Sequence, residues 1–84
     1  MFISNRARLV RQSDSIERLI VDNRPIAAYD MDAKCAYKLG PCDDIEGVNV
    51  YLFRFLAKYL RHAQLKALVT NWDSVIIGSP IPRV

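Results

Sequence analysis

One stretch of the chain, residues 43–62, carries most of the large apolar side chains and constrains the fold more than any other. Each residue of an α-helix turns by ~100°, so apolar positions three and four apart fall on one face. The positions with this spacing are Ile45, Val48, Leu52, Phe55, Leu56, Tyr59 and Ala63. Tyr51, Phe53 and Leu60 widen the apolar face to roughly 200°, against the ~100° of an ordinary surface helix. The spacing predicts a central helix over residues 43–62 that needs cover on two sides.

The polar side of this expected helix is a narrow strip that holds Arg54, Lys58 and Arg61. Asp43 and Asp44 open the helix, where carboxylates cap free amide groups and meet the positive end of the helix dipole. A long strand is excluded, because strict alternation would place Arg54 among apolar side chains.

Residues 16–29 allow two interpretations. Asp14 and Glu17 have the spacing of a capping box, which predicts a short helix over residues 16–20. The alternative is a hairpin whose strands, 18–21 and 26–29, are joined across the turn-forming tetrapeptide Asp22-Asn23-Arg24-Pro25. We favour the helix.

The remaining segments predict further helices. A helix over residues 30–39 would be capped by Asp30 and ended by Gly40-Pro41, because proline cannot continue a helix. Apolar residues recur at helical spacing over residues 65–76, but they point away from the apolar face of residues 43–62. Either the chain turns near residues 61–64, giving a helical hairpin, or the second half of a longer helix packs against a different partner.

The predicted fold class is therefore mainly α, with about four short helices around the central helix 43–62. We expect a single domain over residues 1–84, with an extended arm at 1–12 and an extended tail at 78–84 that are candidates to pair as a short sheet. The alternative is an α+β fold with an N-terminal hairpin.

Composition excludes several classes of protein. Hydrophobic residues make up 51% of the 84 residues, which is typical of a globular domain and not of a disordered chain. No stretch reaches the ~18 apolar residues of a membrane span, and the N-terminus lacks the core of a signal peptide, so we expect a cytoplasmic protein without a membrane partner. Cys35 and Cys42 are expected to be reduced thiols, and a disulfide between them is the alternative.

The residue types that perform catalysis or bind cofactors are sparse. The chain has two cysteines and a single histidine, His62, which is too few for a zinc site of four Cys and His ligands. No serine or cysteine lies one turn from His62 to form a nucleophile pair, and the three glycines are too scattered to cradle a phosphate. The sequence predicts no enzyme, no metal and no cofactor.

The apolar arc of the expected helix leads to the first functional hypothesis, a small protein-binding module of the adaptor or inhibitor type. An arc of roughly 200° is more than one short chain covers, so a second copy or another protein would bury part of it, and a homodimer through the central helix is the common solution. The residues expected to bind the partner are Tyr51, Phe53, Phe55, Tyr59 and Trp72. The simpler interpretation is that these residues form the core.

The alternative hypothesis is a regulator that binds nucleic acid. Fixed cations on one face gain from counterion release when they contact phosphates, and the net charge is +3. The expected contacts are an N-terminal arm and the basic strip of the helix: Arg6, Arg8, Arg11, Arg54, Lys58 and Arg61. The simpler interpretation of the strip is a solvated face that keeps the helix soluble.

Overall fold

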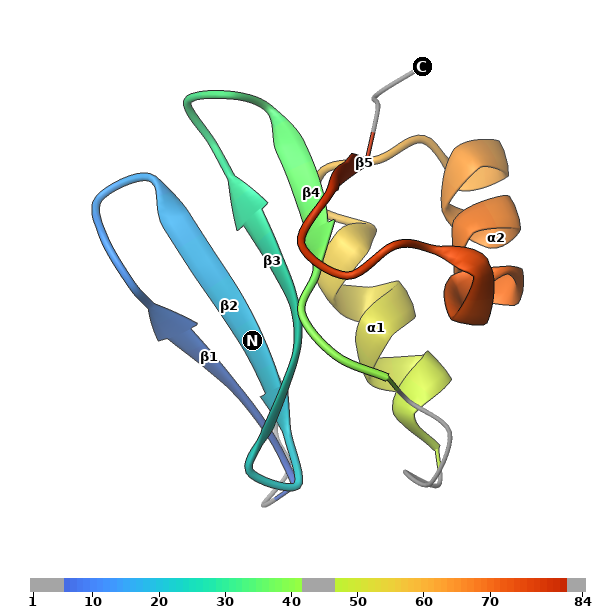
Figure 1. Cartoon of the computed structure of the whole chain (residues 1–84), viewed down its shortest axis with the longest axis horizontal. Helices are drawn as coiled ribbons and strands as arrows, with labels where there is room; N and C mark the ends of the chain where they lie inside the picture. The colour runs from blue at the N-terminus through green and yellow to red at the C-terminus, as the bar shows by residue number, and fades with distance from the viewer. Residues whose placement is uncertain (1–5, 42–46, 82–84) are drawn as a thin grey trace.

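The computed structural model describes residues 6–41 and 47–81 of the chain. In chain order its elements are the strands β1 (Ala7–Arg11), β2 (Ile16–Val21), β3 (Arg24–Asp30) and β4 (Cys35–Lys38), the helices α1 (Val48–Leu56) and α2 (His62–Thr70), the 3-10 helix η1 (Trp72–Ser74) and the strand β5 (Pro80–Ile81). Within these residues, four strands precede both helices and one short strand follows them (Figure 1).

The strands form one antiparallel sheet in the order β1-β2-β3-β4-β5, so β5 returns to pair with β4 after both helices. The turn between β2 and β3 consists of Asp22 and Asn23, which have φ of 52° and 64°. Positive φ at both positions is the signature of a type I′ turn, whose twist matches that of antiparallel strands. Asn and Asp tolerate this conformation better than other residues that carry a side chain.

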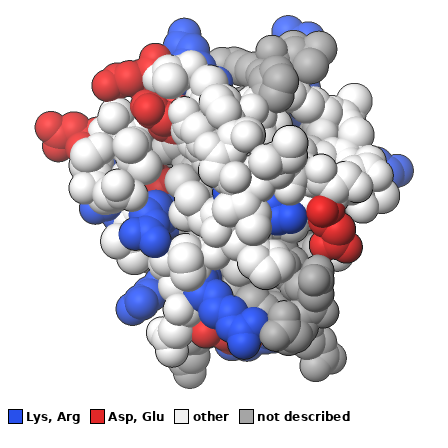
Figure 2. Space-filling view, viewed as in Figure 1, with Lys and Arg blue, Asp and Glu red and all other residues white. Residues whose placement is uncertain are grey.

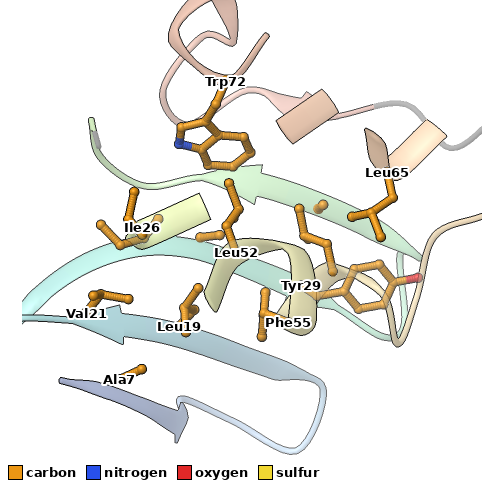
Figure 3. Packing of buried hydrophobic residues seen from close by; sticks show 13 residues of the cluster. Ala7, Leu19, Val21, Ile26, Tyr29, Leu52, Phe55, Leu65 and Trp72 are labelled. Carbon is orange, nitrogen blue, oxygen red and sulfur yellow. The ribbon is translucent and has the colours of Figure 1, made fainter. Parts of the chain in front are cut away.

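Both helices lie on one face of the sheet (Figure 1). Figure 3 shows side chains of the helical layer, such as Leu52 and Phe55, meeting sheet side chains such as Leu19 between the two layers. The fully buried large side chains of this core are Leu19, Val21, Ile26, Leu52, Phe55, Leu56 and Leu65. Burying one such side chain is worth about 1.5–3 kcal/mol, so this single core between sheet and helices holds the domain together.

The prediction of a mainly α fold, a small helical domain, is wrong, because the described chain is built on a five-stranded sheet with two short helices. The alternative prediction, an α+β fold with an N-terminal hairpin, is closer to the observed fold. Residues 16–20, predicted as a helix, belong to β2 and pair with β3. The hairpin alternative for residues 16–29 is confirmed, but its turn is the Asp22-Asn23 pair, because Arg24 and Pro25 of the predicted tetrapeptide belong to β3.

The helix predicted over residues 30–39 is also wrong, although its supposed capping residue does accept backbone hydrogen bonds. The carboxylate of Asp30 accepts the N–H groups of Asp32 and Ala33 at 2.9 and 3.2 Å, but these form the tight turn between β3 and β4. Gly40 ends no helix either: a Cβ at this position would lie 2.7 Å from the carbonyl oxygen of Pro25. Glycine is therefore required there by a close approach of two backbones.

The central helix exists but is shorter than predicted. α1 begins after Gly47, which has a φ of 74°, and ends at Leu56, and the chain then turns over residues 57–61 before α2. The change of direction in the apolar face thus marks a helical hairpin. The predicted capping residues Asp43 and Asp44 lie outside the described residues.

The two ends of the described chain do not pair with each other. Residues 7–11 of the predicted arm form β1 at one edge of the sheet, and Pro80–Ile81 of the predicted tail form β5 at the other edge. Three strands separate them, so the expected pairing of the termini is wrong for the residues that the structure describes.

Candidate functional site

Two apolar grooves flank α2 on the outside of the helical layer. The larger, which we call the β5 groove, has a volume of about 610 Å³ and lies between α2 and β5. Its lining residues are Arg61, Ala63, Gln64, Ala67, Leu68 and Ile81. Alanines on the α2 side keep this groove open, because their side chains are too short to reach across to Ile81.

The second groove, which we call the α1 groove, lies between α1 and α2 and has a volume of about 350 Å³. Its lining residues are Asn49, Val50, Phe53, Arg54 and Val69. Val50 is 54% exposed, which is unusual for a valine in a helix that packs on a sheet. Phe53 is half-buried and meets the ring of His62 edge-on, with centroids 5.9 Å apart.

The helical layer is cationic around both grooves. Residues 47–72 contain Arg54, Lys58, Arg61 and Lys66 and no Asp or Glu. Lys58 is paired, because its ammonium lies 2.9 Å from a carboxylate oxygen of Glu17 in β2. The other three cations form no ion pair with the residues that the structure describes. Each groove therefore has an unpaired arginine at its rim, Arg54 for the α1 groove and Arg61 for the β5 groove.

A polar cluster around Glu17 holds the turn between the two helices against the sheet. The Glu17 carboxylate accepts hydrogen bonds from the ammonium of Lys58 at 2.9 Å and from the hydroxyl of Tyr59 at 3.0 Å, and Arg11 lies 3.8 Å away. Burial alone would raise the pKa of Glu17, but these hydrogen bonds and positive charges outweigh it and hold the pKa below 4.5. Every polar group of this cluster has a partner within it, so its role is structural.

The five aromatic residues predicted to bind a partner lie in different environments. Phe55 and Trp72 are core residues with 0% and 3% of their surface exposed, so neither offers a surface to a partner. Tyr59 is half-buried, stacked on Tyr29 of β3 and bonded to Glu17. Tyr51 is half-buried close to the guanidinium of Arg6. Phe53 lines the α1 groove.

The six basic residues predicted to contact nucleic acid are dispersed over three regions. Arg6, Arg11 and Lys58 are paired with Asp22 or Glu17. Arg54 and Arg61 lie at the rims of the two grooves. Arg8, in β1, points to the face of the sheet that is turned away from the helices, because its neighbour Ala7 faces the core. The expected strip required one helix through residues 54–61, and the turn after Leu56 breaks it.

Sequence reasoning missed the groove residues Val50, Ala67 and Ile81 and the exposed pair Ile76 and Ile77. The reversal of the apolar face near residue 62 was the one signal that pointed to them, since it places apolar side chains on more than one side of α2. The closing partner, Ile81, is separated from α2 by η1 and a loop, so no local pattern connects the two sides of the groove.

Comparison of the chain with models of known protein families, with curated proteins and with solved structures gives no match. Within the described residues, no helix is long and apolar enough to cross a membrane. Nor do residues 6–41 and 47–81 hold a group of three or more His, Cys, Asp or Glu side chains with the geometry of a metal site.

Proposed function

We propose that this protein is a small non-enzymatic binding module that docks an acidic, amphipathic segment of another protein on the grooves beside α2. The observation that carries the proposal is the combination of two apolar grooves with unpaired arginines in a segment, residues 47–72, that contains no Asp or Glu. Apolar side chains of the partner would fill the grooves, and its carboxylates would meet Arg54 and Arg61 at their rims.

Charge favours a different protein over a second copy of this chain as the occupant. Two helical layers placed face to face would bring the cations of residues 47–72 together with no carboxylate of that segment to offset them. Like charges opposed across an interface are unfavourable, so the self-association expected for the central helix is not what the grooves support best. The α1 face with Val48, Leu52, Phe55 and Leu56 is moreover buried by the protein's own sheet.

The test uses a random peptide display library selected on the immobilised protein. We expect the selected peptides to combine Leu, Ile or Phe with several Asp or Glu residues, and to bind more weakly as salt screens the charges. A selection without acidic bias, or with no enriched peptide, would overturn the proposal.

Two variants then locate the bound peptides. Ala67→Glu places a charge in the β5 groove and Val50→Glu does the same in the α1 groove, and at least one should weaken peptide binding about tenfold or more. Arg18→Glu, which makes an even larger change of charge on the opposite side of the sheet, is the control and should leave peptide binding within about twofold. Circular dichroism verifies that each variant is folded. Binding that survives both groove variants contradicts the assignment.

Light scattering decides between a partner and a second copy. A mass of one chain at micromolar concentration is the expected result. A dimer that Ala67→Glu converts to monomer would show that the groove is occupied by another copy, and would replace the proposed acidic partner.

A further inference from the structure

The sheet has a second face, turned away from the helices, that no helix or strand of the described chain covers (Figure 1). The side chains on this face follow from the alternation of each strand: Leu19, Tyr29 and Ala36 face the core, so the residues beside them in the chain point outward. Ile20 and Ala28 agree with this assignment, since both are buried but neither belongs to the core cluster under the helices.

One row of residues crosses this outer face from edge to edge. The register pairs Val10 with Arg18, Arg18 with Ala28, Ala28 with Tyr37, and Tyr37 with Pro80. Neighbouring strands lie about 4.8 Å apart, so Arg18 and Tyr37 are about 10 Å apart across the sheet. Ala28 between them is only 4% exposed, so the half-buried side chains of Arg18 and Tyr37 form the accessible part of the row.

The charge on this face is positive and unpaired. The side chains of Arg8 and Arg18 form no ion pair or hydrogen bond within the described chain, whereas Arg6 and Arg11 are each paired with a carboxylate. The acidic residue of the face, Asp30, accepts two backbone N–H groups in its own turn. Figure 2 shows Lys and Arg side chains over the region of β1 and β2, with acidic side chains beyond them toward the hairpin turns and a further one on the side of the helices.

We infer that this outer face of the sheet binds single-stranded nucleic acid, with a base stacked on Tyr37 and phosphates on Arg8 and Arg18. The ring of Tyr37 is half-buried. Cations beside an accessible aromatic ring are the combination that single-strand-binding surfaces use, because every base offers a flat face and every linkage a charge. A paired duplex offers no such face, so single strands are preferred. The site shares only Arg8 with the basic residues predicted from the sequence, and it is independent of the grooves beside α2.

The experiment is fluorescence anisotropy with labelled oligo-dT, oligo-U and a hairpin duplex, each at two salt concentrations. We expect both single strands to bind more tightly than the duplex and more weakly at the higher salt. Tyr37→Leu should weaken single-strand binding about tenfold with an unchanged salt slope. Arg18→Glu should weaken it as well and reduce the slope by about 1.

Arg61→Glu is the matched control, since it makes the same charge change in the helical layer and should leave oligonucleotide binding nearly unchanged. Should Tyr37→Leu fail to fold, amide shifts of the wild-type protein on titration with oligo-dT serve instead, and the largest shifts should lie in β2, β3 and β4. Any of four results would overturn the inference: no binding at low salt, a duplex bound as tightly as a single strand, poly-glutamate competing as well as oligo-dT, or largest shifts in α1 and α2.

Discussion

The ring of Tyr59 lies flat on the ring of Tyr29, with centroids 3.8 Å apart and planes within 5° of parallel. Tyr29 belongs to β3 and Tyr59 to the turn between α1 and α2, so the stack joins the helical layer to the middle of the sheet. The hydroxyl of Tyr59 then donates to Glu17 of the neighbouring strand β2. One side chain thus fixes the turn to two strands, by ring contact and by a hydrogen bond.

Substitutions at Tyr59 separate these two contributions. Tyr59→Phe keeps the stack and removes the hydrogen bond, so we expect a loss of about 1 kcal/mol in the free energy of unfolding. Tyr59→Ala removes both and should lose about 3 kcal/mol. Urea denaturation measures both, with Tyr37→Phe on the outer face as the control. Equal losses for Phe and Ala would show that the stack contributes nothing.

The hydroxyl of Tyr59 should lose its proton at an unusually high pH. Burial, the hydrogen bond to Glu17 and its negative charge raise the pKa of Tyr59 from 10.0 to about 12. A raised pKa means that this stabilisation is fully present below pH 10 and is lost as the pH rises through about 12. Near-ultraviolet absorbance of the phenolate should show a late-titrating component, which is absent in Tyr59→Phe.

The carboxylate of Glu17 should make the protein sensitive to acid. Its pKa is lowered in the folded state, so its stabilisation is present above its ordinary value of 4.5 and is lost as the pH falls through the folded value. Glu17→Gln keeps the shape and removes the charge, and should lose about 1–2 kcal/mol at neutral pH. We expect this difference from wild type to shrink toward zero below pH 4.5 when unfolding is measured across pH.

Asp32→Asn, which alters an exposed carboxylate in the β3–β4 turn, provides the control for the acid measurement. It should leave the stability of the protein unchanged at neutral pH. A Glu17→Gln variant whose deficit is the same at low and neutral pH would mean that shape, and not charge, accounts for the effect.

The elements of this fold that the sequence predicted correctly are those whose pattern lies within one short segment of the chain. α1 was found because its apolar period is contained within one element, although its start after Gly47 was not predicted. The turn chemistry of Asp22-Asn23 was recognised too, but the strands around it were ranked second, since Ile16, Leu19 and Ile20 fit a helix face as well as a strand. A half-buried strand is recognised by alternating apolar and polar residues. Ile20 lies on the outer face of the sheet but is apolar, so β2 does not show this alternation.

β4 was missed for a related reason, because its core-facing positions are Ala36 and a buried lysine, Lys38. A lysine counts as a polar residue when apolar residues are searched for a period, so Lys38 hides the core-facing side of β4. The two candidate sites are less local still: the β5 groove joins α2 to Ile81, and the row on the outer face takes one residue from each strand. Neither exists until the sheet order is known.

The turn between β2 and β3 should respond to backbone substitutions as a type I′ turn does. Asn23 has a φ of 64°, so Asn23→Gly relieves it and should be neutral or raise stability by up to about 1 kcal/mol. Asn23→Val forces a branched side chain into left-handed backbone and should lose about 1–2 kcal/mol. Thermal unfolding is the measurement, and an equal effect of Gly and Val would contradict the turn type.

Lys38 is the buried cation of the described core, with 4% of its surface exposed. Its ammonium donates to the carbonyl oxygen of Trp72 at 2.9 Å and lies 5.8 Å from the centroid of the indole ring, and no described carboxylate pairs with it. Burying a charge without a carboxylate is unfavourable, so the charge itself adds little net stability. What stabilises is the stem, which fills space between β4 and η1, and the single hydrogen bond.

Two substitutions at Lys38 separate the contribution of its aliphatic stem from that of its ammonium group. Lys38→Met fills nearly the same space, and the Trp72 carbonyl keeps the N–H of Val75 as a donor at 3.1 Å, so we expect a loss of about 1 kcal/mol or less. Lys38→Ala also opens a cavity and should lose about 2–4 kcal/mol in the free energy of unfolding. Urea denaturation of the two variants decides the matter, with the indole fluorescence of Trp72 reporting whether its surroundings persist. If Met is as destabilising as Ala, the ammonium and not the stem holds β4 to η1.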